Sequence, residues 1–334
     1  MGPRPQLDDM ILVSGASGFV GRHLVEALHQ RIPSEKIRVF DAQPPARVLH
    51  AGVETFCGVI EDPAAVAPAV QGAETVVHLA AKVQPDSREL HDLARVNVDG
   101  TRQLYSAAVQ AGCKLFLHMS SAGVYGPPRS PDPFRESDAV SPATPYQRTK
   151  WEAEEALRHT DAKGTTLNIL RPAGIYGAGS YLEIPGYKRV LRQKWSIELK
   201  GGVIVHPTHV SDVVEAVLAV LERPAPHGTV FNVGGERPIL LQDFQALVAA
   251  ALNVPRWRLV LPSTVTDPLA RVVGPLLTRT GRQIPLLIEF GRGHVFSSAV
   301  DDRVFRLRYP RAPVRSLRNG LQEHIDWART HRLL

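Results

Sequence analysis

A tyrosine and a lysine four residues apart, Tyr146 and Lys150, are the side chains of this sequence best placed to transfer a proton. Positions i and i+4 share one face of a helix, so the lysine ammonium is expected near the phenol. A free tyrosine has a pKa of about 10, and lowering that pKa by three units takes roughly 4 kcal/mol. A neighbouring cation in a partly dry cleft supplies part of this energy. The pair therefore predicts an acid–base couple, with an ordinary pair of surface side chains as the alternative.

A glycine-rich turn runs from Gly15 to Gly21, directly after a predicted strand and at the start of a predicted helix. Glycine permits a tight turn and lets the backbone approach a pyrophosphate, and a helix N-terminus presents free N–H groups with partial positive charge. In this context the turn predicts a dinucleotide-binding site. Its predicted binding residues are Gly15, Gly18, Phe19, Val20 and Gly21.

An acidic residue, Asp41, follows the second predicted strand. A carboxylate there binds both hydroxyls of an adenosine ribose and repels a 2′-phosphate, so NAD is favoured over NADP as the cofactor. The positively charged nicotinamide ring of NAD would supply the rest of the energy that ionises Tyr146. The alternative is that Asp41 belongs to a surface turn.

Two serines, Ser120 and Ser121, stand at the carboxyl end of another predicted strand. Open α/β sheets bind their ligands at that edge, where a hydroxyl can hydrogen-bond a substrate oxygen. A serine in a turn usually bonds only the local backbone, so this site gains its weight from Tyr146.

The elements that must position these residues alternate between β-branched runs and helical patterns, which predicts βαβ units and a parallel sheet. Strands are expected at Met10–Val13, Ile37–Phe40, Val53–Phe56, Thr75–Leu79, Lys114–Met119, Thr165–Leu170 and Thr229–Val233. Helices are expected at Phe19–Gln30, Ala64–Val70, Leu90–Ala111, Tyr146–His159, Val210–Leu221, Leu240–Leu252 and Leu317–Thr330.

This order predicts an α/β fold, a doubly wound Rossmann sheet with a smaller C-terminal substrate-binding lobe. The expected NAD-binding domain covers residues 8–178, with a strand and a helix from about 203–235. Residues 179–202 and 236–334 are expected to form the lobe.

The composition, 44% hydrophobic and 22% charged, is ordinary for a soluble globular protein. No apolar run is long enough for a membrane span, and the N-terminus lacks the apolar core of a signal peptide, so a cytoplasmic location is expected. Cys57 and Cys113 lie in apolar runs and are expected to be buried free thiols. The net charge of +6 comes from scattered arginines, and nothing resembles a nucleic-acid-binding module.

A basic run from Tyr187 to Lys194 has the spacing of a helix with a solvated charged face, and the alternative is a site for an anionic substrate group. The histidines are expected to pack in the core or on the surface and not to bind metal, because no cysteine cluster accompanies them. They are His78, His118, His206 and His209.

Taken together and in this order, the three sites resemble the extended short-chain dehydrogenase/reductase family, with its NAD-dependent epimerases and dehydratases and its 3β-hydroxysteroid dehydrogenase-like branch. The likeness covers most of the chain. Its further motifs are His78-Leu79-Ala80-Ala81, Asn97-Val98-Asp99-Gly100-Thr101, Leu170-Arg171-Pro172-Ala173-Gly174-Ile175-Tyr176-Gly177, His209-Val210-Ser211-Asp212-Val213 and Phe231-Asn232-Val233-Gly234-Gly235.

The resemblance implies a role for each matching position. Ser121 matches the catalytic serine, with Ser120 as the less favoured neighbour, and Tyr146 matches the acid–base tyrosine. Lys150 matches the lysine that also holds the nicotinamide ribose. The remaining implied cofactor contacts are Ala80 and Ala81 along the cofactor and Pro172, Ala173 and Ile175 against the nicotinamide amide.

The adenine contact departs from the family pattern. The family often has Gly-Asp after the third strand, whereas here Gly58 is followed by Val59, and Asp62 comes three positions later. An apolar packing contact is the alternative. The resemblance also implies a homodimer, paired through the helices Leu90–Ala111 and Tyr146–His159.

Motifs that this sequence lacks help to exclude classes of substrate. Ala122-Gly123 lacks the Asp-Glu of the sugar-nucleotide 4,6-dehydratases, and His206-Pro207-Thr208 lacks the arginine that epimerases often direct at a diphosphate. The sequence around Leu276–Arg279, Phe296–Ser298 and Leu307–Pro310 is more similar to the 3β-hydroxysteroid dehydrogenase-like branch. A dehydrogenase or ketoreductase with a fairly apolar substrate is favoured.

The sequence thus predicts an NAD-dependent oxidoreductase that interconverts a secondary alcohol and a ketone of a small-molecule substrate. One alternative is a nucleotide-sugar 4-epimerase with tightly bound NAD, using Arg189, Arg192 or Lys194 for the diphosphate. The other is a non-catalytic NAD-sensing protein, against which the intact set of serine, tyrosine and lysine argues.

Overall fold

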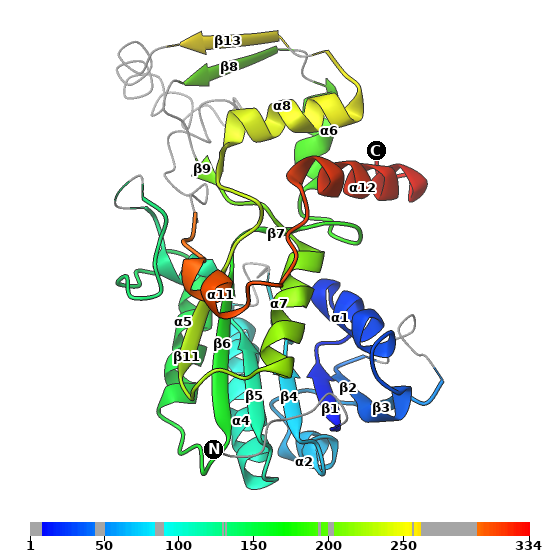
Figure 1. Ribbon diagram of the computed structural model, residues 1–334, viewed down its shortest axis with the longest axis vertical. Helices are drawn as coiled ribbons and strands as arrows, with labels where there is room; N and C mark the ends of the chain where they lie inside the picture. The colour runs from blue at the N-terminus through cyan, green and yellow to red at the C-terminus, as the bar shows by residue number, and fades with distance from the viewer. Residues whose placement is uncertain are drawn as a thin grey trace.

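A seven-stranded parallel sheet forms the centre of the protein, in the strand order β11-β6-β5-β4-β1-β2-β3 (Figure 1). The computed structural model describes residues 9–43, 51–83, 90–128, 130, 132–192, 195–199, 204–255, 257–261 and 299–334. The strands are β1 (Ile11–Ser14), β2 (Ile37–Asp41), β3 (Glu54–Cys57), β4 (Thr75–His78), β5 (Leu115–Met119), β6 (Thr166–Pro172) and β11 (Thr229–Val233). All seven predicted strands are confirmed to within about two residues.

Helices cover both faces of the sheet, which is why its central strands are apolar throughout and not alternating. On one face α1 (Phe19–His29) packs against α7 (Val210–Glu222) over the inward side chains of Ile11 and Val13. On the other face α2 (Pro63–Val70), α4 (Thr101–Gln110) and α5 (Pro145–Arg158) pack over Leu12. The predicted doubly wound Rossmann fold is confirmed.

A second hydrophobic cluster lies at the carboxyl end of the sheet, in the upper part of Figure 1. It is built from α6 (Ile184–Arg192), α8 (Leu241–Leu252) and α12 (Leu317–Thr330). Short strands pair beside them: β7 (Ile175–Tyr176) with β10 (Thr208–His209), β9 (Ile204–Val205) with β12 (Ile239–Leu240), and β8 (Trp195–Leu199) with β13 (Trp257–Leu261). The helix α11 (Arg303–Arg308) packs against β11. A C-terminal lobe is therefore present, and the domain boundaries drawn from the sequence stay a prediction.

The helix expected over Leu90–Ala111 is not regular. It consists of α3 (Leu90–Ala94), a π-helical segment (Arg95–Gly100) and α4. Asn97 in the π-helical segment turns its amide onto the backbone of Lys82, accepting from Lys82 N at 2.8 Å and donating to Lys82 O at 3.0 Å. The wider turn lets this side chain reach across to the segment that follows β4. The helix ends as predicted at Gly112, which has a φ of +78°.

Two further expectations have clear outcomes. Cys113 is buried, but Cys57 is exposed, because β3 is the edge strand and its side chains are largely uncovered. The described part of the basic run, Tyr187–Arg192, falls on α6, and Gln193 and Lys194 lie outside the described residues. Tyr187 and Val190 are buried while Lys188 and Arg189 are exposed, so the charged face of this part is solvated as expected.

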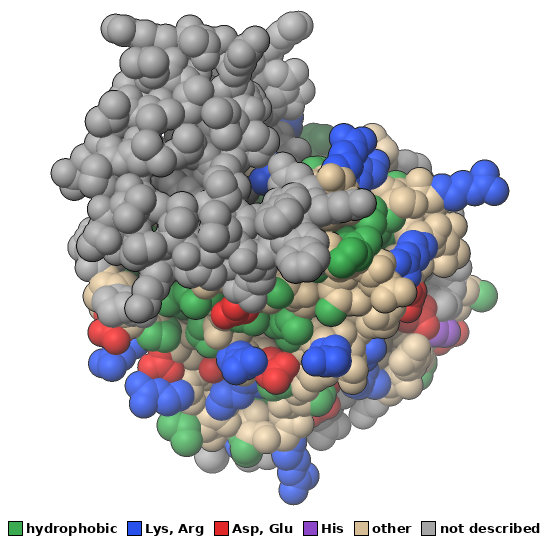
Figure 2. All heavy atoms as spheres, turned by 90° about the horizontal axis from the view of Figure 1, so that it is seen from above, with side chains coloured by type: hydrophobic (Ala, Val, Ile, Leu, Met, Phe, Trp, Pro, Cys, Tyr) green, Lys and Arg blue, Asp and Glu red, His purple; other side chains and the backbone are tan. Residues whose placement is uncertain are grey.

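The surface seen from the lobe end carries Lys and Arg side chains interspersed with acidic and apolar ones (Figure 2). Among the described residues, every helix is too short or too polar to span a bilayer.

Candidate active site

The glycine-rich turn follows β1 and leaves no room for side chains. Gly15 has a φ of +75°, and a Cβ there would stand 2.5 Å from the backbone nitrogen of Ala80. A Cβ on Gly21 would collide with the carbonyl of Gly15. The turn therefore brings the backbone after β1 against the backbone after β4, as a site that approaches a ligand through its main chain requires.

The start of α1 is suited to an anion. Its N-cap residue, Gly18, provides no capping side chain, and Ser17 Oγ is buried without a partner among the described residues. Asp41 at the end of β2 accepts a hydrogen bond from Ser17 N at 2.8 Å, which places its carboxylate beside the turn. An uncapped helix N-terminus next to a carboxylate fits the diphosphate and the adenosine ribose of NAD.

The structure shows what replaces the family's aspartate in the predicted adenine region. Asp62 caps α2, accepting a hydrogen bond from Ala64 N at 2.9 Å, so its carboxylate is already committed. Val59 is 45% exposed and offers an apolar surface. These positions favour the apolar alternative named above.

The tyrosine and the lysine lie in the first two turns of α5. Thr144 and Gln147 form a capping box, and Pro145 occupies the first turn, so the start of this helix is fixed by its own sequence. Tyr146 is half-buried and Lys150 is 2% exposed. Within the described part of the chain, no hydrogen bond joins the Tyr146 hydroxyl or the Lys150 ammonium to another group.

Burial alters the pKa of both groups. It raises the pKa of Tyr146 to about 12 and lowers the pKa of Lys150 to about 8, while the carboxylate of Glu154 acts on Lys150 in the opposite direction. Burial therefore keeps the phenol in its neutral form in the chain without cofactor. The lowering predicted from the sequence stays a prediction for the NAD complex.

The two serines after β5 have different roles in the structure. Ser120 is buried and donates its hydroxyl proton to Glu154 Oε1 at 2.5 Å. Ser121 is half-buried, caps the 3-10 turn Ala122–Tyr125, and accepts from Gly123 N at 3.0 Å. Because Ser121 acts there as an acceptor, its own proton is available to a substrate oxygen, and of the two it is the candidate for that role.

The segment after β6 completes the same sheet edge. Ala173 N donates to Val233 O at 3.0 Å, extending the β6–β11 pairing, and β7 begins at Ile175. Pro172 and Ala173 are buried and Ile175 is half-buried. The predicted nicotinamide segment thus lies beside the strand that carries the serines.

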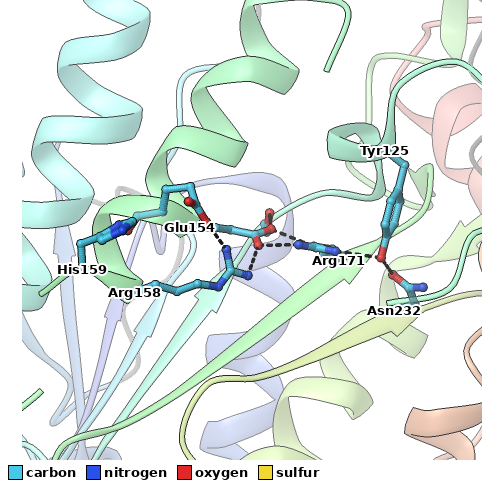
Figure 3. A network of polar contacts seen from close by, with 8 residues as sticks. Tyr125, Glu154, Arg158, His159, Arg171 and Asn232 are labelled. Atoms are coloured by element: carbon cyan, nitrogen blue, oxygen red, sulfur yellow. Dashed lines mark hydrogen bonds and ion pairs between the residues drawn. The ribbon is translucent and has the colours of Figure 1, made fainter. Parts of the chain in front are cut away.

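A buried ion-pair network that was not predicted from the sequence joins β6 to the second half of α5 (Figure 3). Arg171, from β6, binds Glu154 with two hydrogen bonds of 2.9 and 2.7 Å. Arg171 Nη1 also donates to the Tyr125 hydroxyl at 2.9 Å, and that hydroxyl donates to Asn232 Oδ1 at 2.8 Å. One sequence feature could have revealed Glu154: it follows Lys150 by four residues, as Lys150 follows Tyr146, so all three share one face of α5.

Two buried histidines, His78 and His118, lie close enough to Lys150 for its charge to affect them. His78 contacts Ser14 Oγ at 2.7 Å and Thr101 Oγ1 at 2.8 Å, and its ring centroid is 5.3 Å from that of His118. Burial, with a smaller contribution from Lys150, lowers the pKa of His78 to about 3 and that of His118 well below its usual range. Both rings are therefore neutral at pH 7. In the described residues, no group of three or more His, Cys, Asp or Glu is arranged to hold a metal ion.

Comparisons with known proteins agree with this geometry. The profile of the NAD dependent epimerase/dehydratase family matches residues 11–234. The chain is 31% identical over 264 residues to the N-acetyl-alpha-D-glucosaminyl-diphospho-ditrans,octacis-undecaprenol 4-epimerase of Escherichia coli O157:H7, covering 77% of each protein. It is 33% identical over 202 residues to the 3 beta-hydroxysteroid dehydrogenase type 7 of Homo sapiens, covering 54% of each.

The fold is shared with a solved structure as well. A short-chain dehydrogenase/reductase superfamily protein from Agrobacterium tumefaciens, crystallised with bound NAD, superimposes with a TM-score of 0.74 and 25% identity, over 97% of this chain and 98% of that one.

Proposed function

This chain belongs to the NAD dependent epimerase/dehydratase family, an enzyme family of the short-chain dehydrogenase/reductase type, and we propose that it interconverts a secondary alcohol and a ketone on a fairly apolar substrate. The observation that most supports the proposal is that the glycine turn, Asp41 and Ser121 all follow strands of one parallel sheet at its carboxyl edge, and that α5, which carries Tyr146 and Lys150, packs against the turn after Ser121. Their roles are our inference from this placement and from the family.

NAD is the cofactor of this family; the glycine turn, Asp41 and Lys150 would hold it, and it would supply the hydride acceptor and, when oxidised, a positive charge. In the oxidation direction Tyr146, as tyrosinate, takes the hydroxyl proton of the substrate. Ser121 donates a hydrogen bond to the substrate oxygen. Lys150 holds the nicotinamide ribose and stabilises the tyrosinate. Reduction uses the same groups in reverse, with Tyr146 as the proton donor.

Two observations support a dehydrogenase. Ala122-Gly123 stands where the sugar-nucleotide 4,6-dehydratases have Asp-Glu, and a 3β-hydroxysteroid dehydrogenase is among the relatives. Of the three segments that suggested this branch, Leu276–Arg279 and Phe296–Ser298 lie outside the described residues. Leu307 is 83% exposed at the end of α11, so that segment contributes to the surface.

A 4-epimerase is the second candidate, favoured by the 31% identity to the Escherichia coli epimerase over 77% of both chains. Arg189 and Arg192 are exposed on α6 and would be the candidates for a diphosphate, while Lys194, the third predicted candidate, lies outside the described residues. The two functions differ in what happens to NAD. An epimerase restores its cofactor in every turnover, whereas a dehydrogenase releases it changed.

The deciding experiment uses the purified full chain. Native mass spectrometry reports whether NAD is retained, and NADH fluorescence follows turnover with NAD⁺ and a panel of 3β-hydroxysteroids, long-chain secondary alcohols, nucleotide sugars and polyprenyl-diphosphate sugars. The proposal expects cofactor-free protein and NADH formed with a steroid or apolar alcohol. Retained NAD with epimerised sugar and no net NADH would replace the proposal with the second candidate.

We also propose a homodimer, paired through the predicted helices Leu90–Ala111 and Tyr146–His159. A homodimer through α4 and α5 is supported by the way these helices pack side by side on one face of the sheet, and light scattering of the purified chain tests it. The cytoplasmic location remains an expectation from the sequence.

A further inference from the structure

One carboxylate, that of Glu154, joins three segments of the candidate site. Its side chain is fully buried, and each of its oxygens accepts two hydrogen bonds. Oε1 accepts from Ser120 Oγ and from Arg171 Nε, and Oε2 accepts from Arg171 Nη2 and from Arg158 Nη2 at 2.7 Å. Figure 3 shows Glu154 between the two arginines.

The positions of its partners matter for the chemistry. Ser120 immediately precedes Ser121, Arg171 immediately precedes the Pro172–Ile175 segment, and Glu154 itself stands one helical turn beyond Lys150. A carboxylate whose acceptor sites are all used has a single low-energy orientation, because rotating it would leave buried donors without a partner. Glu154 therefore fixes the end of β5 and the end of β6 relative to α5.

The charges around Lys150 are unequal. Arg158 and Arg171 are both cations near Glu154, so the ammonium of Lys150 would be a third positive charge beside one negative charge. Among the described residues, the histidines that the charge of Lys150 affects are neutral: His118 from β5 and His78 from β4. The phenol of Tyr146, one turn earlier on the same helix, is neutral as well. From the π-helical segment packed against α5, the facing group is the amide of Asn97, which donates to Thr149 Oγ1.

We propose that Glu154 is a positioning residue of the proton-transfer site: it holds the Ser120–Ser121 loop in place through Ser120 and keeps Lys150 cationic from one turn away. The inference rests on the proposed function, because it concerns the lysine that stabilises the tyrosinate. It adds a residue that never touches the substrate and acts through its neighbours.

The test compares the wild-type chain with Glu154→Gln, which keeps the shape and removes the charge. NMR of ¹⁵N-lysine-labelled protein, with the Lys150 signal assigned from Lys150→Met, follows the titration of this ammonium and requires no substrate. We expect Lys150 to lose its proton at a pH lower by about one unit or more in Glu154→Gln, because an opposite charge has been removed. Arg158→Gln is the matched control: it removes a partner of the same carboxylate but keeps the negative charge, so the pKa of Lys150 must not fall.

Ser120→Ala tests the other half of the proposal and keeps it open to refutation if Glu154→Gln does not fold. It removes one hydrogen bond and no charge, so kcat should fall severalfold while KM for NAD and the Lys150 titration stay as in the wild type. An unchanged Lys150 titration in Glu154→Gln, or a wild-type kcat in Ser120→Ala, would overturn the proposal. Failure of the proposed function would appear elsewhere, as full turnover in Tyr146→Phe.

Discussion

The two halves of α5 treat their polar groups in opposite ways. In the second half, Glu154 and Arg158 are hydrogen-bonded to each other, and the carboxylate also binds Arg171 and Ser120. In the first half, burial raises the pKa of Tyr146 to about 12 and lowers the pKa of Lys150 to about 8, both away from the charged forms that the proposed reaction uses. One helix face thus carries two reactive groups, of which the buried ammonium of Lys150 costs stability at neutral pH, and beside them two groups that are paired.

This difference shows how a site can stay reactive inside a packed protein. Groups that must change charge during a reaction are kept without fixed partners, and their positions are held by neighbours whose hydrogen bonds are complete. Substitutions of Tyr146 and of Glu154 should therefore separate activity from stability.

The largest effect is expected for Tyr146→Phe. Removing the hydroxyl removes the proton acceptor, so kcat should fall by roughly 10²–10⁴-fold. The free energy of unfolding should change little, since the hydroxyl makes no hydrogen bond within the described part of the chain. Steady-state kinetics and urea denaturation of the same preparation measure both quantities. Loss of folding together with activity would contradict the separation.

Glu154→Gln should act mainly on stability. Removing one member of a buried ion pair leaves Arg171 without its partner and should cost about 3–5 kcal/mol in the free energy of unfolding. Glu215→Gln provides the control, because Glu215 pairs with Arg31 at the surface and its loss should cost at most about 1 kcal/mol. Equal effects of the two substitutions would mean that the buried pair is not special.

Lys150→Met should make the protein more stable and inactive. The pKa of Lys150 falls from its ordinary 10.5 to about 8, a difference that corresponds to about 3 kcal/mol. The unfolded chain binds this proton more tightly, so the cost is fully present below pH 8 and disappears as the pH rises through 10.5.

Urea denaturation at pH 7 measures the gain, with Lys114→Met as the control. Lys114 forms surface ion pairs with Asp9 and Glu74, so its loss should lower stability by no more than about 1 kcal/mol. A Lys150→Met protein that is less stable than the wild type would show that the ammonium has a stabilising partner.

The smallest effect concerns His78, a neutral group that faces Lys150. Its pKa is lowered from 6.5 to about 3, so below pH 6.5 the unfolded chain takes up a proton that the folded chain does not. This group alone should lower the free energy of unfolding by about 2 kcal/mol between pH 7 and pH 5. In His78→Gln that loss should shrink by the same amount, and in the exposed-site control His159→Gln it should remain. Identical pH dependence in all three proteins would contradict a neutral His78.

Much of the fold could be predicted from local patterns. The strands, the glycine turn and the start of α5 depend on residues close in sequence, such as the Thr144–Gln147 capping box. The π-helical segment was missed because it depends on Asn97 reaching Lys82, 15 residues away. The short paired strands of the lobe were not predicted for the same reason. β9 and β12 have only two residues each and are defined by the strands they pair with.

The residues of the candidate site also fall into those that local spacing predicts and those that depend on contacts distant in sequence. Spacing alone indicated Tyr146, Lys150 and the glycine turn, but the Tyr125–Asn232 hydrogen bond joins residues 107 positions apart. The distinction between Ser120 and Ser121 required knowing that Glu154 takes the proton of one of them. Desolvation of Tyr146 was not visible in the sequence either, because it comes from the packing around α5.

The ionisation of Tyr146 is the most direct test of the central claim. The ultraviolet difference spectrum between wild type and Tyr146→Phe reports the tyrosinate of this residue alone, and it can be titrated with and without NAD⁺. Without NAD⁺ we expect no tyrosinate signal up to pH 9, because burial raises the pKa of Tyr146 to about 12. With NAD⁺ bound, we expect a signal by about pH 8, near the range in which a general base works. A titration that NAD⁺ leaves unchanged would contradict the proposed acid–base role of Tyr146.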